Sequence, residues 1–362
     1  MEVCAKTYKW LLPAGWIYGF VVSVRNRLYD FGIMKSRSFP IPVISVGNVA
    51  VGGTGKTPHV EYILELLRTS HYPAVLSRGY KRRSKGFVLA SKSSTAADIG
   101  DEPLQIKTKF PDVLVAVDAD RCHGIDLLMV HRTSRHTDVI VLDDAFQHRR
   151  VRPGLNIVLV EYGRTRGDHM LPAGRLREPM SGLDRADMVV VTKCPPTLTQ
   201  ADIEATAAHI RLRRGQPLYF STMEYQQLEP LFCGDERTLE SISQYHVLLV
   251  TGIAQPTPLL NELKRHTPHV KHLSFGDHHE FSAGDIRRIC TDFEALPQPR
   301  MVVTTEKDAA RLTHTAGLTQ EVRQNLFLLP IRVRILNNAR HAFDNDILHF
   351  CNSPIDKEKK EN

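Results

Sequence analysis

The feature that most constrains the fold is a glycine-rich loop that follows an apolar strand near the N-terminus. The strand ends near Val46, and residues 51–58 read VGGTGKTP. Glycines leave backbone N–H groups free to converge on phosphate oxygens, and a lysine in this place reaches the β- and γ-phosphates. The next threonine can ligate Mg²⁺ at the start of a helix. The predicted nucleotide-binding residues are Gly52, Gly53, Thr54, Gly55, Lys56 and Thr57, the last being also a metal candidate.

The loop departs from the general phosphate-loop consensus at one position. Ala50 stands six residues before Lys56, where the consensus has glycine. The alternative is an ordinary glycine-rich turn before a helix, but Gly-Lys-Thr directly after a buried-type strand favours phosphate binding. Lys56 is also a catalytic candidate, because its charge would stabilise the transferred phosphoryl group.

A second strand supports this interpretation by ending in two acids. Residues 139–142 are apolar, and Asp143 and Asp144 follow them. A central parallel strand delivers a carboxylate to the metal beside a phosphate loop in this way. The alternative is a helix N-cap, where aspartate is also favoured. Together with the phosphate loop, the metal role is the stronger hypothesis, and one of the two acids is expected to touch Mg²⁺ directly.

Apolar, β-branched runs alternate with amphipathic stretches along the first part of the chain. Continuous apolarity indicates strands buried on both faces, and hence a mostly parallel sheet flanked by helices in an α/β, P-loop NTPase-like fold. A further α/β series begins near residue 247, after a polar stretch at 211–216. We therefore expect a P-loop core domain over 29–215, a second, smaller α/β domain over 216–350 that closes over the cleft, and a charged tail over 351–362.

Charge and cysteine content narrow the choice of partners and compartment. The formal net charge of +7 suits an anionic substrate or an anionic membrane surface. We find no aromatic-interleaved basic motif or recognition-helix pattern that would indicate nucleic acid. Six scattered cysteines without a Cys-x-x-Cys pair favour reduced thiols in a cytoplasmic setting over a disulfide framework or a zinc site.

Residues 10–24 form an apolar, aromatic segment with basic residues on both sides. The segment is shorter than the ~20 residues that span a bilayer, and no signal-peptide cleavage site follows it. Tryptophan, tyrosine and basic flanks are typical of a helix that lies in the membrane interface. A helix packed on the protein's own core is the alternative, and a tilted span stays open. We expect residues 1–28 to associate with a membrane.

Several loops occur in an order that is similar to that of a known family. Beside the phosphate loop, these are Ser77–Tyr80, Gly100–Pro103, Asp143–Arg149, Leu171–Pro179 and Thr304–Asp308. The set closely resembles the tetraacyldisaccharide 4'-kinase family of the lipid A pathway of Gram-negative bacteria, from the N-terminal apolar segment to about residue 350. The resemblance implies a lipid kinase that uses ATP and Mg²⁺ to phosphorylate the 4'-hydroxyl of a lipid A disaccharide 1-phosphate. It also implies an enzyme at the cytoplasmic face of the inner membrane, in contact with its lipids.

The acidic turn at Asp101 and Glu102 supplies further catalytic candidates. By itself, such a Gly-Asp-Glu-Pro turn is more often exposed than catalytic. Two adjacent carboxylates can divide roles, with one acting as a base and the other turned toward the metal, so Glu102 is a metal candidate. The resemblance implies that Asp101 is the catalytic base and that His278, rather than His279, is its partner.

Arginines near the ends of the predicted strands are candidates for binding the substrate phosphates. Guanidinium groups hold phosphate oxygens in a planar, bidentate way, and α/β sheets bind ligands at this edge. A single arginine is more often a solvated surface charge, but we expect at least two of the set to function. The candidates are Arg78, Arg121, Arg149, Arg175 and Arg177.

The main alternative function is a membrane-associated P-loop GTPase or nucleotide switch. Residues 304–308 loosely resemble the base-reading Asn-Lys-x-Asp loop of guanine-nucleotide proteins, although they could also read adenine or cap a helix. The paired acids and the absence of a clear switch threonine disfavour this alternative. A scaffold with a vestigial phosphate loop is disfavoured by the intact Lys56 and Thr57. The sequence leaves the acyl-chain preference and the oligomeric state open.

Overall fold

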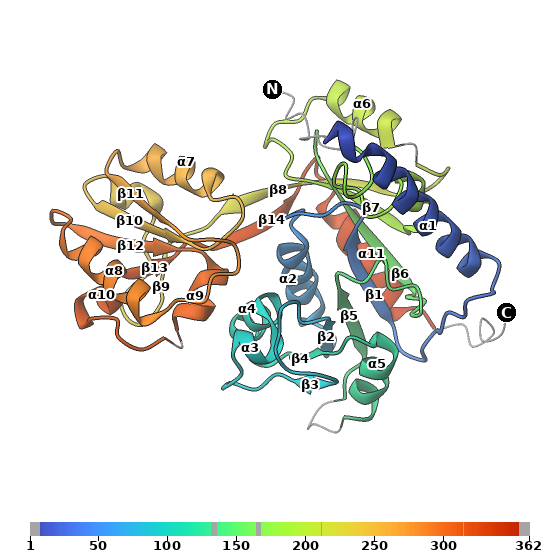
Figure 1. Cartoon of the computed structure of the whole chain (residues 1–362), viewed down its shortest axis with the longest axis horizontal. Helices are drawn as coiled ribbons and strands as arrows, with labels where there is room; N and C mark the ends of the chain where they lie inside the picture. Colours follow the sequence, from blue (N-terminus) through green and yellow to red (C-terminus); the bar gives the residue numbers. More distant parts are fainter. Residues whose placement is uncertain (1–7, 132–135, 164–167, 211, 314, 355–362) are drawn as a thin grey trace.

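The computed structural model describes residues 8–131, 136–163, 168–210, 212–313 and 315–354, which form two α/β lobes (Figure 1). Within these ranges the larger lobe is built on a nine-stranded sheet with the order β14-β8-β7-β6-β1-β5-β2-β4-β3. The smaller lobe holds a five-stranded sheet with the order β11-β10-β12-β13-β9. The predicted class, mostly parallel sheets flanked by helices with a second, smaller lobe, is confirmed.

Parallel pairing joins the central strands of the larger sheet. Every residue of β1, β2, β5 and β7 is buried, as their continuous apolarity predicts. The strands are β1 (Val43–Asn48), β2 (Pro73–Ser77), β4 (Leu114–Val117), β5 (Val139–Asp143), β6 (Leu155–Glu161), β7 (Met188–Thr192) and β8 (Leu218–Tyr225), with β3 (Val88–Leu89) and β14 (Ile331–Ile335) antiparallel at the edges.

Helices cover both faces of this sheet. Apolar side chains of α2 and α11 pack on one face, and those of α5 pack on the other. The helices of the larger lobe are α1 (Leu12–Asp30), α2 (Lys56–Leu67), α3 (Ala96–Ile99), α4 (Asp101–Lys109), α5 (Arg121–Val130), α6 (Gln200–Ile210) and α11 (Arg340–Asn352), with 3₁₀ turns η1 (Lys9–Leu11) and η2 (Met180–Arg185).

The smaller lobe repeats the α/β plan around its own core. Its central strands β10 and β12 are buried and pair in parallel, and α8 packs on them through Ile286, Ile289 and Phe293. The strands are β9 (Glu229–Pro230), β10 (His246–Thr251), β11 (Val270–Ser274), β12 (Arg300–Thr304) and β13 (Leu326–Leu328). The helices are η3 (Leu239–Ile242), α7 (Thr257–His266), α8 (Ala283–Glu294), α9 (Glu306–Leu312) and α10 (Gln320–Gln324).

The division between the lobes differs from the predicted boundary at 215/216. Strand β8 pairs in parallel with β7, and β14 pairs antiparallel with β8, so both strands belong to the larger sheet. After β14 the chain continues into α11, whose Phe343 and Ile347 are fully buried in the larger core. The smaller lobe is therefore inserted between β8 and β14, which run side by side toward it in Figure 1. The apolarity of a strand such as β8 does not show which of two sheets it joins, so the domain boundary predicted from the sequence was wrong.

Helix α1 combines the two interpretations considered for the N-terminal segment. One side packs on the larger lobe, where Gly15 and Gly19 lie against Met170 and Val22 is buried. The other side exposes Trp16 and Phe20 at 71% and 70%. Among the described residues, no helix is long and apolar enough to cross a membrane. Residues 1–7 and 355–362 of the predicted terminal segments lie outside the described ranges.

Candidate functional site

The phosphate loop joins β1 to α2 at the carboxyl edge of the larger sheet. Gly52 and Gly55 adopt positive φ values of 116° and 86°, a conformation that side chains rarely take. Gly55 is the N-cap of α2, which begins at Lys56, so the first backbone N–H groups of the helix face the loop. Thr54 is buried, and its hydroxyl group accepts a hydrogen bond from Asn48 Nδ2 at 2.8 Å. The loop thus has the geometry expected of a phosphate cradle.

A buried histidine supports the loop from behind, and sequence reasoning missed it. His59 is 1% exposed; its Nδ1 lies 2.7 Å from the carbonyl oxygen of Gly55 and its Nε2 lies 3.0 Å from the hydroxyl of Ser221 in β8. Burial lowers the pKa of the imidazole to about 4, so it is neutral at physiological pH. No sequence pattern distinguishes His59, because its partner is distant in the chain.

The two acids at the end of β5, Asp143 and Asp144, lie beside the phosphate loop in different environments. Asp143 is buried, and burial, followed by the charge of Asp144, raises its pKa to about 7. Burial would also raise the pKa of Asp144, but Lys56 and Arg177 hold it below the ordinary value. Lys56 Nζ is 3.6 Å from Asp144 Oδ1, and Arg177 Nη1 donates to the same carboxylate at 3.0 and 3.1 Å.

Asp101 lies at the start of α4 and is buried, not exposed as an isolated acidic turn would suggest. His278 of the smaller lobe reaches it across 177 residues of sequence, with Nδ1 2.5 Å from Oδ2. Burial would raise the pKa of Asp101, but hydrogen bonds from Arg311 and His278 hold it below the ordinary value. His279 instead contacts Asp285 at 3.0 Å, so the structure brings together the predicted pair and leaves His279 out of it.

Two of the candidate arginines, Arg78 and Arg121, are available near the acids. Arg121 is 3% exposed, and burial, helped by nearby Arg78, lowers its pKa to about 10. Its Nη1 donates to the carbonyl oxygens of Asp118 and Ala119, while its Nε has no hydrogen-bond partner among the described residues. Arg78 is exposed at the end of β2. A buried guanidinium with a free N–H is suited to an anionic ligand.

The remaining candidate arginines already have protein partners. Arg149 donates to the carbonyl oxygen of Asn26 and to Asp30, each at 2.7 Å, and so joins α1 to the larger lobe. Arg177 is engaged with Asp144. Arg175 lies 3.7 Å from Glu161. The structure therefore gives Arg149 a structural role, and its role in binding substrate phosphate stays a prediction.

The segment 304–308 does not form a base-reading loop beside the phosphate loop. It ends β12 in the smaller sheet, and Thr305 caps α9 by accepting a hydrogen bond from Asp308 N. Helix α9 then docks on α4, with Lys307 Nζ 3.2 Å from Glu102 and Arg311 Nη2 2.5 Å from Asp101. Of the open possibilities for this segment, helix capping is the one observed. Lys307 and Arg311 were missed as site residues, because their partners lie about two hundred residues away.

Comparison with known proteins decides the family. Residues 7–351 match the family described as LpxK, tetraacyldisaccharide-1-P 4'-kinase. The chain belongs to this kinase family. Proteins named tetraacyldisaccharide 4'-kinase are similar over most of their length: one from Phocaeicola vulgatus is 49% identical, with 95% of each chain covered, and one from Bacteroides thetaiotaomicron is 48% identical, with 95% of this chain and 93% of that one covered.

A solved structure of the tetraacyldisaccharide-1-P 4'-kinase family supports the fold and the nucleotide. The crystal structure titled as the "apo" form of LpxK from Aquifex aeolicus in complex with ATP is 30% identical to this chain, with a TM-score of 0.72. The match covers 94% of this chain and 98% of that one. The predicted P-loop kinase fold and the predicted enzyme class, an ATP-dependent tetraacyldisaccharide 4'-kinase, are confirmed, and the GTPase alternative is not favoured.

Proposed function

We propose that this chain transfers the γ-phosphate of ATP to the 4'-hydroxyl of a tetraacyldisaccharide 1-phosphate at the cytoplasmic face of the inner membrane. One observation carries the assignment of the site: Asp101, at the start of α4, pairs with His278 of the smaller lobe. Strands β1 and β5 are neighbours in the sheet, so the phosphate loop and Asp143 share one edge. Glu102, next to Asp101, is close enough for its charge to contribute to the raised pKa of Asp143. This edge is where α/β sheets bind their ligands.

Lys56 and the phosphate loop would hold the triphosphate. The first backbone N–H groups of α2 lie at its positive end, and Lys56 adds a positive charge whose attraction strengthens as the transferred group develops negative charge. Lys56 pairs with Asp144 in this structure, which places its ammonium group next to the acids that would hold the metal.

The residues beside the loop fit Mg²⁺. Asp143 Oδ1 is buried without a hydrogen-bond partner among the described residues, and carboxylate and hydroxyl oxygens are the donors that Mg²⁺ prefers. Asp143, Asp144, Glu102 and Thr57 are the candidate ligands. No group of three or more His, Cys, Asp or Glu side chains in the described ranges would enclose a metal by itself, so water and ATP would complete the shell. The ion would neutralise charge on the transferred phosphoryl group.

The geometry suggests how the pair divides its work. Both oxygens of Asp101 are engaged, Oδ1 by Arg311 and Oδ2 by His278, and its lowered pKa makes it a weak proton acceptor. His278 is anchored through Nδ1, which leaves Nε2 for an acceptor hydroxyl; Asp277 Oδ2 lies 3.6 Å from Nε2. We therefore propose that Asp101 orients the ring and His278 takes the proton, a reversal of the roles predicted from the sequence.

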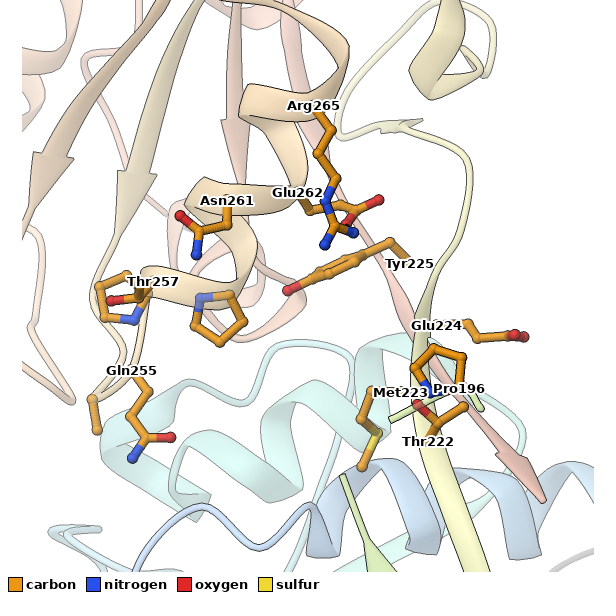
Figure 2. Close-up of a pocket in the computed structure, with 13 residues that line it drawn as sticks. Pro196, Thr222, Met223, Glu224, Tyr225, Gln255, Thr257, Asn261, Glu262 and Arg265 are labelled. Carbon is orange, nitrogen blue, oxygen red and sulfur yellow. The ribbon is translucent and has the colours of Figure 1, made fainter. Parts of the chain in front are cut away.

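A cavity of about 870 Å³ lies next to the phosphate loop and would take the nucleoside. Figure 2 shows Gln255, from the loop before α7, and Asn261, from α7 itself, across from Met223 and Tyr225 of β8. Met223 packs directly against Gly55, so the cavity begins where the loop ends. This arrangement supports the proposal that the smaller lobe closes over ATP.

Helix α1 would bring the site to the lipid. Trp16 and Phe20 project from it, and Arg149 fixes it to the loop that follows Asp143 and Asp144. Exposed aromatic side chains on one face of a helix partition into the membrane interface. Arg78 and Arg121 would then be the counter-charges closest to a phosphorylated sugar at the sheet edge.

The assay gives the purified chain ATP or GTP, Mg²⁺ and an acylated glucosamine disaccharide 1-phosphate in detergent micelles. We expect a bisphosphorylated product with ATP, located on the 4'-oxygen by ³¹P NMR, and little with GTP. Absence of transfer to the disaccharide, or equal use of GTP, would count against the proposal.

Membrane contact is tested separately with the double variant Trp16→Ser, Phe20→Ser. We expect reduced binding to anionic vesicles and a raised KM for lipid, with the KM for ATP unchanged. Val130→Ser is the matched control, because Val130 is 69% exposed on α5. Unchanged vesicle binding of the double variant would move the contact to another surface.

A further inference from the structure

Arg311 is a buried arginine of the smaller lobe whose guanidinium group faces the larger lobe. It is 8% exposed, although it lies near the end of α9. Its Nε donates to Asp101 Oδ1 at 2.8 Å, and its Nη2 is 2.5 Å from Oδ2. The guanidinium group thus reaches both oxygens of the carboxylate, one by a hydrogen bond and the other by an ion pair, which the single ammonium group of lysine does not reproduce.

The same guanidinium group also holds the loop that carries His278. Its Nη1 donates to the carbonyl oxygen of His279 at 3.2 Å and to Asp308 Oδ1 at 3.1 Å. Asp308 in turn accepts from Gly252 N at 2.8 Å, and the carbonyl oxygen of Gly252 accepts from His278 N at 3.3 Å. His278 itself has a φ of 62°, a left-handed conformation that needs such support.

We propose that Arg311 is a positioning residue for phosphoryl transfer, which holds Asp101 and the His278 loop in register. One guanidinium group contacts both sides of the pair, the carboxylate directly and the histidine through the adjacent carbonyl group. The proposal rests on the function proposed above for Asp101 and His278. It differs from a purely structural role, in which Arg311 would join the lobes without affecting the geometry of proton transfer.

The position of Arg311 has a consequence for the charge around the imidazole. The groups that face His278 are Asp101 from α4, Asp277 from its own loop, and the edge of the Tyr80 ring, while Arg311 and Lys307 of α9 act through the two acids. Without Arg311, two carboxylates face the ring with one cation fewer. The hydrogen bond between His278 Nδ1 and Asp101 should therefore be the contact that loss of Arg311 disturbs most.

The experiment compares Arg311→Gln and Arg311→Lys with the native chain. Arg300→Gln is the matched control, because Arg300 also binds a carboxylate, donating from Nε and Nη2 to Oε1 of Glu321 at 3.2 and 2.7 Å within the smaller lobe. We measure kcat, both KM values and thermal unfolding. We expect Arg311→Gln to lower kcat by about 10²-fold, since a displacement on the order of 1 Å in a catalytic group costs that much. The KM for ATP should change less than about threefold, and Arg311→Lys should recover part of kcat.

A second measurement does not depend on turnover. The proton between His278 Nδ1 and Asp101 should give a far-downfield ¹H NMR signal, assigned by its loss in His278→Asn. We expect Arg311→Gln to lose or broaden this signal and Arg300→Gln to keep it. A folded Arg311→Gln variant with the native signal and the native kcat would overturn the proposal. A native chain that shows the signal but transfers no phosphate would count against the proposed function alone.

Discussion

Two regions of the site differ in how far apart in the chain their parts lie. Gly52 to Thr57 come from one stretch that links β1 to α2. Asp101, His278 and Arg311 come from three segments and two lobes, separated by 177 and 210 residues. The phosphate loop should therefore keep its shape when the lobes move apart, whereas the pair exists only when α9 is docked on α4. Nucleotide binding and proton transfer should be separable by mutation.

The largest effect is expected from the locally built region. Lys56→Ala should lower kcat by about 10³-fold, because the lysine stabilises charge that develops in the transition state. Transfer of the γ-phosphate from radiolabelled ATP to the disaccharide measures this. Lys271→Ala, at a half-exposed pair with Asp292, is the control and should behave as the native chain. Near-native turnover of Lys56→Ala would remove the phosphate-loop assignment.

The pair between the lobes should affect turnover without affecting nucleotide binding. Asp101→Asn and His278→Ala should each lower kcat by about 10²-fold while ATP affinity stays within about threefold, because the pair acts on the acceptor hydroxyl. The double variant should lose less than the product of the two, since the residues act as a unit. Titration calorimetry with ATP distinguishes the regions. Loss of ATP binding in Asp101→Asn would place Asp101 in the metal site.

Lys109 tests whether docking of the lobes matters beyond the pair itself. It donates to Glu61 of α2 at 2.6 Å and to Glu306 of α9 at 2.7 Å. Lys109→Met should lower kcat by about tenfold, because two buried carboxylates then repel each other across the lobes. Burial, and then Glu306, raise the pKa of Glu61 to about 7 in the native chain.

The raised pKa of Glu61 determines the direction of the pH dependence expected for the stability of Lys109→Met. A carboxyl group with a raised pKa contributes full stability below its unfolded pKa of about 4.5, and this stability is lost as pH rises through about 7. Lys109→Met should lose stability more steeply over this range in urea titrations. Adding Glu306→Gln should restore part of kcat. If the double variant is no better than Lys109→Met, the repulsion is not the cause.

The smallest effect on turnover is expected from His59, through which β8 supports the phosphate loop. His59→Gln should lower kcat by about threefold, because the glycines fix most of the loop. Its main effect should be on stability at low pH. The native imidazole, with a pKa lowered to about 4, stays neutral while the unfolded chain takes up a proton below about 6.5.

Stability from His59 is therefore present above pH 6.5 and lost as pH falls toward 4, by up to about 3 kcal/mol. His59→Gln should flatten this part of the pH dependence in urea unfolding. An equally steep loss in the variant would show that His59 is not buried and neutral. The result would then weaken the contrast between a local phosphate loop and an assembled pair.

The phosphate loop and the two acids at the end of β5 could be predicted because the residues of each lie next to one another in the sequence. A buried strand, a turn with positive φ at glycine and a helix N-terminus are all specified within a few residues, so the pattern determines the geometry. Asp143 and Asp144 follow from the same logic, because the carboxyl ends of neighbouring parallel strands meet at one edge. The fold class followed from the continuous apolarity of the strands.

The features that depend on contacts between distant parts of the chain could be seen only in the tertiary structure. No local pattern shows that β14 and α11 return to the first sheet, since an apolar strand can pair with either one. The resemblance placed Asp101 with His278, but the engagement of both Asp101 oxygens and the part taken by Arg311 appear only when α9 is docked on α4. Contacts across 210 residues depend on how two separately built cores meet, and the sequence specifies this through the whole packed interface, not through any single motif.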